Sequence, residues 1–171
     1  FPNGNEFYSF CIRKHTSTHL TALDIHQLGL KEVARIRSEM QKIIEEVEFD
    51  GDFAAFVNFL REDSRFYHQS EDDLLQGYRD ICKRADAMMP ALFGKLPRTP
   101  YGVRAIPSHE APRSTTAYYM PPPADGTQPG WFYANTFDLQ SRPIYEMEAL
   151  ALHEAVPGHH HQLALQGEME G

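Results

Sequence analysis

A proline stands inside the segment of this chain that carries its most recognisable chemical motif. Residues 153–161 read H-E-A-V-P-G-H-H-H, and they follow an apolar run over residues 147–152. Proline has no backbone N–H, and its ring clashes with the carbonyl four residues earlier, so a helix that reaches Pro157 cannot continue straight. Gly158, directly after it, tolerates unusual backbone angles. The sequence therefore predicts a helix that breaks near residue 157.

The His153-Glu154 pair is typical of zinc hydrolases, in which a neutral imidazole binds the metal and the carboxylate accepts a proton from metal-bound water. The usual motif is H-E-x-x-H, but Pro157 occupies the place of the second histidine. On a straight helix His159 would lie about 240° around from His153, and His160 about 10 Å further along the axis. If Pro157 and Gly158 loop out, His159 takes the place of the missing ligand.

This geometry predicts His153 and His159 as zinc ligands and Glu154 as the general base. His160 is the alternative second ligand if the bulge takes up three residues; otherwise it is expected to orient substrate or stabilise an oxyanion. Gln162 is expected to support a ligand. Because burying the His-Glu pair without a partner is costly, a metal is favoured here over the alternative, a hydrogen-bond network.

The segments around this motif are also distinctive. They are residues 117–123 (A-Y-Y-M-P-P-P), 125–126 (D-G), 129–136 (P-G-W-F-Y-A-N-T), 142–143 (R-P) and 26–29 (H-Q-L-G), with Tyr145, Glu148 and Gln162. Together with residues 153–160 they resemble the bacterial domain of unknown function 885 family, grouped with the zincin-like metallopeptidases of peptidase clan MA.

The resemblance carries several expectations. Family members are several times longer, so the chain is expected to be an internal fragment of a longer protein. A glutamate in a later Glu-Gly-Trp-like segment, beyond Gly171, would complete the metal site. The resemblance also implies a bacterial parent that is periplasmic or membrane-anchored and exported.

Charge and hydropathy exclude two kinds of partner. Acidic residues outnumber basic ones by 24 to 16, a formal net charge of −8, which argues against nucleic acid because its partners need a basic surface. No apolar run approaches the roughly 18 residues of a membrane span.

The remaining pattern predicts an α+β fold in three stretches. Residues 1–96 are expected to form a helical layer, with a short buried helix over 6–13 and a long amphipathic helix that starts at the Thr21/Asp24 capping box and runs to about Val47. Residues 97–140 are β-rich, with strands over 101–106, 115–120 and 131–135 in a small antiparallel sheet. Residues 141–171 form the kinked metal-ligand helix, capped by Ser141.

His15 and His19 form a second candidate metal site. They are spaced as metal ligands can be, but no carboxylate accompanies them, so a surface role is favoured.

Zincin-like peptidases commonly hold an extended substrate against an edge strand beside the metal. The strand over residues 131–135 is the candidate, with Tyr133 or Asn135 contacting substrate.

The function predicted is a piece of a zinc-dependent metallopeptidase-like hydrolase that acts on a peptide-like substrate. The remainder of the parent chain is needed to complete the site, so the isolated fragment is expected to be inactive. One alternative is a non-catalytic binding module on a peptidase-like scaffold, with a structural or lost metal. Another is a helical interaction domain with no metal. Glu154 favours the enzyme, because a purely structural zinc has no need of that neighbour.

Overall fold

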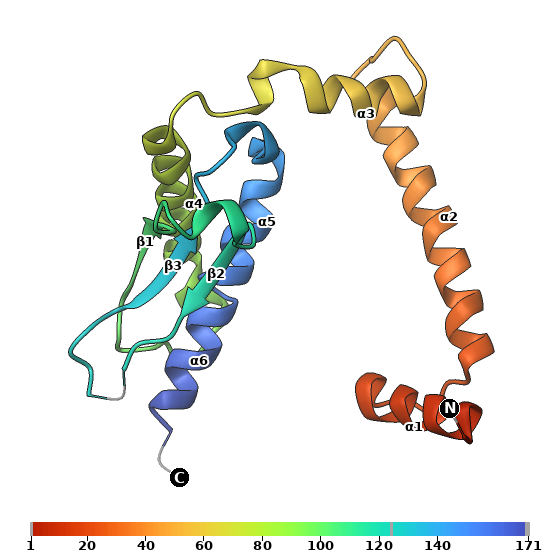
Figure 1. The fold of residues 1–171 in the computed structure, drawn as a ribbon, viewed down its shortest axis with the longest axis horizontal. Helices are drawn as coiled ribbons and strands as arrows, with labels where there is room; N and C mark the ends of the chain where they lie inside the picture. Colours follow the sequence, from red (N-terminus) through yellow and green to blue (C-terminus); the bar gives the residue numbers. More distant parts are fainter. Residues whose placement is uncertain (1, 124, 170–171) are drawn as a thin grey trace. The chain divides into compact units, whose positions relative to one another are not determined.

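The computed structural model of the chain describes residues 2–123 and 125–169. The chain divides into two compact units, Phe1–Phe59 and Leu60–Gly171, which are described separately. Helices dominate, and the second unit holds a three-stranded sheet (Figure 1). The expected α+β class is confirmed.

The first unit contains two helices and most of a third. They are α1 (Gly4–Thr16), α2 (Ala22–Glu46) and α3 (Phe53–Glu62). The predicted capping box starts α2: the Thr21 hydroxyl accepts from the Asp24 N–H, and the Asp24 carboxylate accepts from the Thr21 N–H. These two bonds satisfy N–H groups that the first turn of a helix leaves without a partner.

The expectation of a buried first helix is wrong for α1. Ile12 is its buried residue, whereas Phe7, Tyr8 and Phe10 are at least half exposed. At roughly 100° per residue, positions 7, 8 and 10 span an arc of about 160° of the helix surface. The described residues leave this arc largely exposed.

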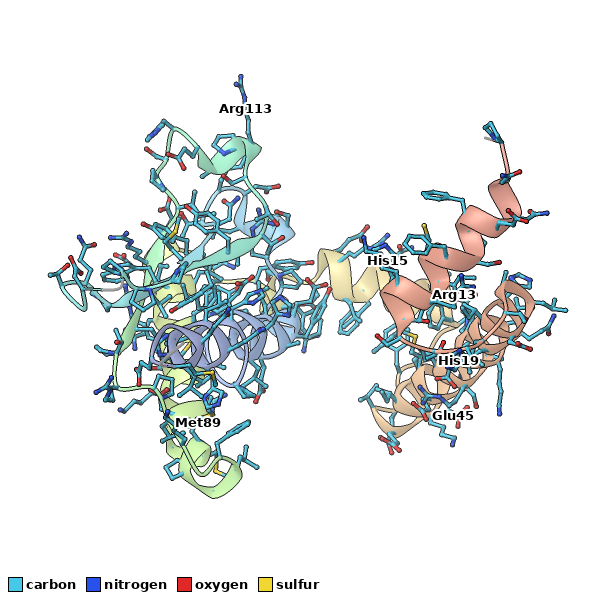
Figure 2. All side chains as sticks on the ribbon, turned by 90° about the horizontal axis from the view of Figure 1, so that it is seen from below. Arg13, His15, His19, Glu45, Met89 and Arg113 are labelled. Carbon is cyan, nitrogen blue, oxygen red and sulfur yellow. The ribbon has the colours of Figure 1, made fainter. Side chains whose placement is uncertain are left out.

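His15 and His19 do not share a helical face. Helix α1 ends at Thr16, and Ser17 follows with a left-handed φ of 55°, so the chain turns before it reaches His19. Both imidazoles are exposed (Figure 2). This arrangement agrees with the surface role favoured from the sequence.

The second unit packs two helices against one side of a sheet. Its elements after α3 are η1 (Ser64–Phe66), α4 (Glu71–Leu92), β1 (Tyr101–Ala105), η2 (Ala111–Arg113), β2 (Ala117–Met120), β3 (Gly130–Ala134), η3 (Leu139–Ser141), α5 (Ile144–Glu154) and α6 (His159–Gly167). Helix α4 packs on α5 and β1, and α5 packs on β2 (Figure 1). Phe132, Leu74 and Met147 are fully or almost fully buried between these layers.

The sheet is mixed, with strand order β1-β3-β2. Strand β2 pairs antiparallel with β3, as expected, but β1 pairs parallel with β3. The prediction of an antiparallel sheet is therefore wrong for β1. The connection over residues 106–116 places β2 two strand positions away from β1. Strand β3 then fills the position between them.

Asn135 holds that connection in place. Its side-chain N–H₂ donates to the carbonyls of Ala111 and Thr115 at 2.8 and 3.0 Å, and its carbonyl accepts from the Phe137 N–H. The residue is 1% exposed. The expected substrate contact of Asn135 is therefore wrong, because its polar atoms already bond within the fold.

Helix α5 begins later than expected. Ser141 does not cap it: Ser141 ends η3, and its hydroxyl donates to the Asp138 carbonyl at 2.8 Å. The N-cap is Pro143, and Ile144 is the first helical residue. A proline disfavours helical angles in the residue before it, here Arg142, so the helix cannot begin before Pro143.

Candidate metal centre

The predicted helix break is confirmed. Helix α5 ends at Glu154 and α6 begins at His159. Across the break the Gly158 N–H donates to the Leu152 carbonyl, six residues earlier, and the His160 N–H donates to the Ala155 carbonyl, five residues earlier. Regular bonding resumes when the Gln162 N–H donates to the Gly158 carbonyl. Since an α-helical bond spans four residues, the six-residue bond indicates a two-residue insertion.

Glycine is required at position 158 by a close backbone approach. A Cβ atom there would lie 1.9 Å from the carbonyl oxygen of His153 and 2.5 Å from that of Leu152. Both atoms belong to the backbone of α5 and cannot turn aside. The lack of a side chain at Gly158 therefore lets α6 start directly against the end of α5.

Replacing Gly158 with alanine is expected to push α6 away from α5 and separate His159 from His153. We expect metal affinity in the intact parent protein to fall at least tenfold, because a displaced ligand weakens a metal site as strongly as the loss of a supporting partner does. Metal titration measures this. Gly167→Ala is the matched control, since a Cβ at Gly167 meets no atom within 4 Å. Equal affinities for the two variants would contradict the account.

The insertion brings three potential ligands together. His153, Glu154 and His159 each offer one atom, and these atoms lie within 4.8 Å of one another. The two imidazole centres are 4.6 Å apart at an interplanar angle of 80°. Two atoms bound to one zinc at 2.0–2.1 Å can be at most about 4.2 Å apart, so a small side-chain rotation suffices to close the site. The donor set fits zinc.

Glu154 is buried beside the two histidines. It is 5% exposed, and its Oε2 atom has no hydrogen-bond partner among the described residues. The Nε2 atom of His159 lies 4.0 Å from this oxygen. Burial raises the pKa of the Glu154 carboxyl, while His159 and His153 act in the opposite direction. A buried carboxylate oxygen without a partner is costly, so it indicates that another group completes this site.

His160 points away from this cluster. It is 3% exposed, its Nδ1 is 2.8 Å from the Tyr119 hydroxyl, and its ring centre is 4.6 Å from that of Tyr101. Burial, then the neighbouring His161, lowers the pKa of His160 to about 4. The expected alternative roles of His160, as second ligand or as substrate contact, do not fit this geometry, because the ring is enclosed beneath the sheet.

An opening of about 300 Å³ lies beside the cluster and leads to strand β2. It is lined by Ala117, Tyr118, Tyr119, Glu154, His159 and Leu163. Strand β2 is an edge of the sheet, whereas β3 is its centre and is paired on both sides. The expectation that residues 131–135 form the substrate strand is therefore wrong, and the edge strand beside the cluster is β2.

The other candidate residues lie outside the cluster. Tyr133 stacks on Tyr118, with ring centres 4.7 Å apart. Gln162 is exposed on α6, and its supporting role stays a prediction. Glu168, a nearby acid, is held elsewhere: its carboxylate accepts from the Arg98 and Thr99 N–H groups, and the Arg98 N–H lowers its pKa. Glu170 lies outside the described residues.

Comparisons with known proteins identify a matching family and a similar solved structure. The family model of a bacterial protein of unknown function, DUF885, matches residues 1–171. Among solved structures, the chain is similar to "the putative lipoprotein from Colwellia psychrerythraea", with a TM-score of 0.87 and 30% sequence identity. The match covers 98% of this chain and 29% of that one. The search of curated proteins gave no match.

None of the helices in residues 2–123 and 125–169 is long and apolar enough to cross a membrane. This agrees with the absence of a long apolar run in the sequence.

Proposed function

This chain belongs to the bacterial DUF885 family of proteins of unknown function, and we propose that it supplies the catalytic centre of a zinc-dependent hydrolase that cleaves peptide-like substrates. One observation carries the proposal. The buried Glu154 carboxylate, one oxygen of which has no hydrogen-bond partner in the part of the chain that the structure describes, lies beside two imidazoles that a two-residue insertion brings together.

His153 and His159 are the proposed zinc ligands, each binding through a neutral imidazole nitrogen. A bound zinc ion would polarise the substrate carbonyl and lower the pKa of a water molecule. Glu154 accepts the proton of the attacking water and delivers it to the leaving amine. Burial shifts the pKa of this carboxyl upward, which is the direction that strengthens a carboxylate as a general base.

Strand β2 is the proposed support for the substrate backbone. Within residues 2–123 and 125–169 no strand pairs with its outer edge, and Ala117, Tyr118 and Tyr119 line the opening beside Glu154 and His159. A peptide can add to such an edge through main-chain hydrogen bonds, with side-chain pockets giving selectivity. This arrangement supports a peptide-like substrate.

The third protein ligand is proposed to come from the remainder of the parent chain. A catalytic zinc normally has three protein ligands and a water, while the described residues offer two histidines beside the proposed base. The chain spans 29% of the Colwellia protein. That protein carries the description of a lipoprotein, which supports an exported parent here as well.

A comparison of the intact parent with the isolated chain tests this assignment. We expect the parent to bind one zinc per molecule and to hydrolyse members of a peptide library. Residues 1–171 alone should bind zinc weakly and cleave nothing, because two ligands hold the ion poorly. Zinc content and library hydrolysis are the measurements. A parent that binds zinc without hydrolysis would support a binding module instead. A fully occupied site within residues 1–171 would show that no further ligand is needed.

A further inference from the structure

A row of side chains crosses the face of the sheet opposite the helices. Tyr118 on β2 pairs with Tyr133 on β3, which pairs with Arg104 on β1. Directly paired residues point to the same face of a sheet. Phe132 and Ala134, the neighbours of Tyr133 along β3, are fully buried on the helix side. The Tyr118–Tyr133–Arg104 row therefore lies on the outer face.

Arg104 is held between two aromatic rings of the central strand. Its guanidinium carbon is 4.2 Å from the ring centre of Trp131 and 4.4 Å from that of Tyr133, and it donates to the Tyr133 hydroxyl. Gly102 makes room for this arrangement, since a Cβ there would lie 2.6 Å from the Trp131 ring. Aromatic stacking fixes a guanidinium plane, and the N–H groups that do not donate to Tyr133 remain available to bind an anion.

Among the described residues, no carboxylate pairs with the positive charge of Arg104. Its side chain is exposed. The chain has a net charge of −8, yet none of the ion pairs among the described residues joins a carboxylate to Arg104. A fixed, exposed guanidinium of this kind fits an external carboxylate, which it can bind through two parallel hydrogen bonds.

The row connects this guanidinium to the candidate metal centre. Tyr118 lines the opening beside Glu154 and His159. The guanidinium lies over β3, and neighbouring strands of a sheet are about 4.8 Å apart. A peptide added to the free edge of β2 would lie two strand positions from β3, and therefore about 10 Å from the guanidinium. Roughly three extended residues span that distance.

We propose that Arg104 binds the C-terminal carboxylate of a peptide substrate whose preceding residues lie on β2 and cross the Tyr118–Tyr133 face. The substrate class is then peptides with a free C-terminus within about three residues of the segment held on β2. This proposal rests on the proposed function, since it names the substrate of the same centre.

The test compares two peptides of one sequence, a free acid and its C-terminal amide, with the intact parent protein. We expect wild type to favour the acid by about tenfold in kcat/KM, the effect of one charge-assisted interaction. Arg104→Met keeps the length of the side chain but loses its charge and should remove the preference. Arg113→Met is the control, because Arg113 is exposed on η2 and projects away from the rest of its unit (Figure 2).

Two outcomes would overturn the proposal. One is an acid preference that survives Arg104→Met; the other is no acid preference in wild type. If wild type hydrolyses neither peptide, the proposed function fails, and the Arg104 site is tested by binding alone. Binding is measured by calorimetry with Glu154→Gln protein, with and without Arg104→Met. The acid should bind more tightly than the amide only when Arg104 is present. Equal binding of acid and amide to the protein that retains Arg104 would overturn the site as well.

Discussion

Replacing Glu154 with glutamine is expected to abolish hydrolysis by the intact parent protein while its zinc content stays at the wild-type level. Glutamine keeps the size and burial of the side chain but cannot accept a proton from water. Loss of a general base typically lowers the rate by about 10²–10⁴-fold. The measurements are kcat on a cleaved peptide and zinc per protein molecule.

Glu146→Gln is the matched control for this variant, because Glu146 lies on the same helix, in its exposed first turn. It should retain full activity. Undiminished hydrolysis by Glu154→Gln would remove the proposed mechanism. Loss of zinc together with activity would instead make Glu154 a metal ligand. The zinc measurement is needed to separate the two roles, because the Glu154 carboxylate lies close enough to the two imidazoles to bind the same ion.

Replacing His153 with alanine is expected to remove both zinc and activity. The two imidazoles lie on either side of the helix break, and among the described residues the cluster that could hold a metal contains no third histidine. His160 is enclosed against Tyr119 and Tyr101. The loss of kcat should therefore be at least as large as for Glu154→Gln. His159→Ala should behave in the same way.

His109→Ala is the control for the histidine variants, because His109 is exposed and carries no role in the site. Zinc content and thermal unfolding should be measured together. A folded His153→Ala protein that retains a full zinc complement would show that the ion binds elsewhere.

The sequence was most informative where one residue dictates backbone geometry. Pro157 cannot continue a helix, and only glycine fits at position 158, against the His153 carbonyl. The helix break and its two-residue length therefore followed from the residue types. The convergence of His153 and His159 followed from that length. The Thr21 capping box was predictable for the same reason, because its bonds form between residues three apart.

Long-range features could not be predicted in this way. The positions of the three strands followed from local composition, but their order did not, because the connection held by Asn135 decides it. The choice of residues 131–135 as the substrate strand failed for that reason. The enclosure of His160 depends on Tyr119 and Tyr101, which are 41 and 59 positions away, and no local pattern reveals such a contact.

Anomalous X-ray diffraction at the zinc absorption edge, from crystals of the intact parent protein, tests the central claim most directly. We expect one strong peak at 2.0–2.1 Å from an imidazole nitrogen of both His153 and His159, with the Glu154 carboxylate beside it and a third ligand from the later part of the parent protein. The absence of a peak between these two histidines in zinc-replete protein, or a peak bound by other residues, would contradict it.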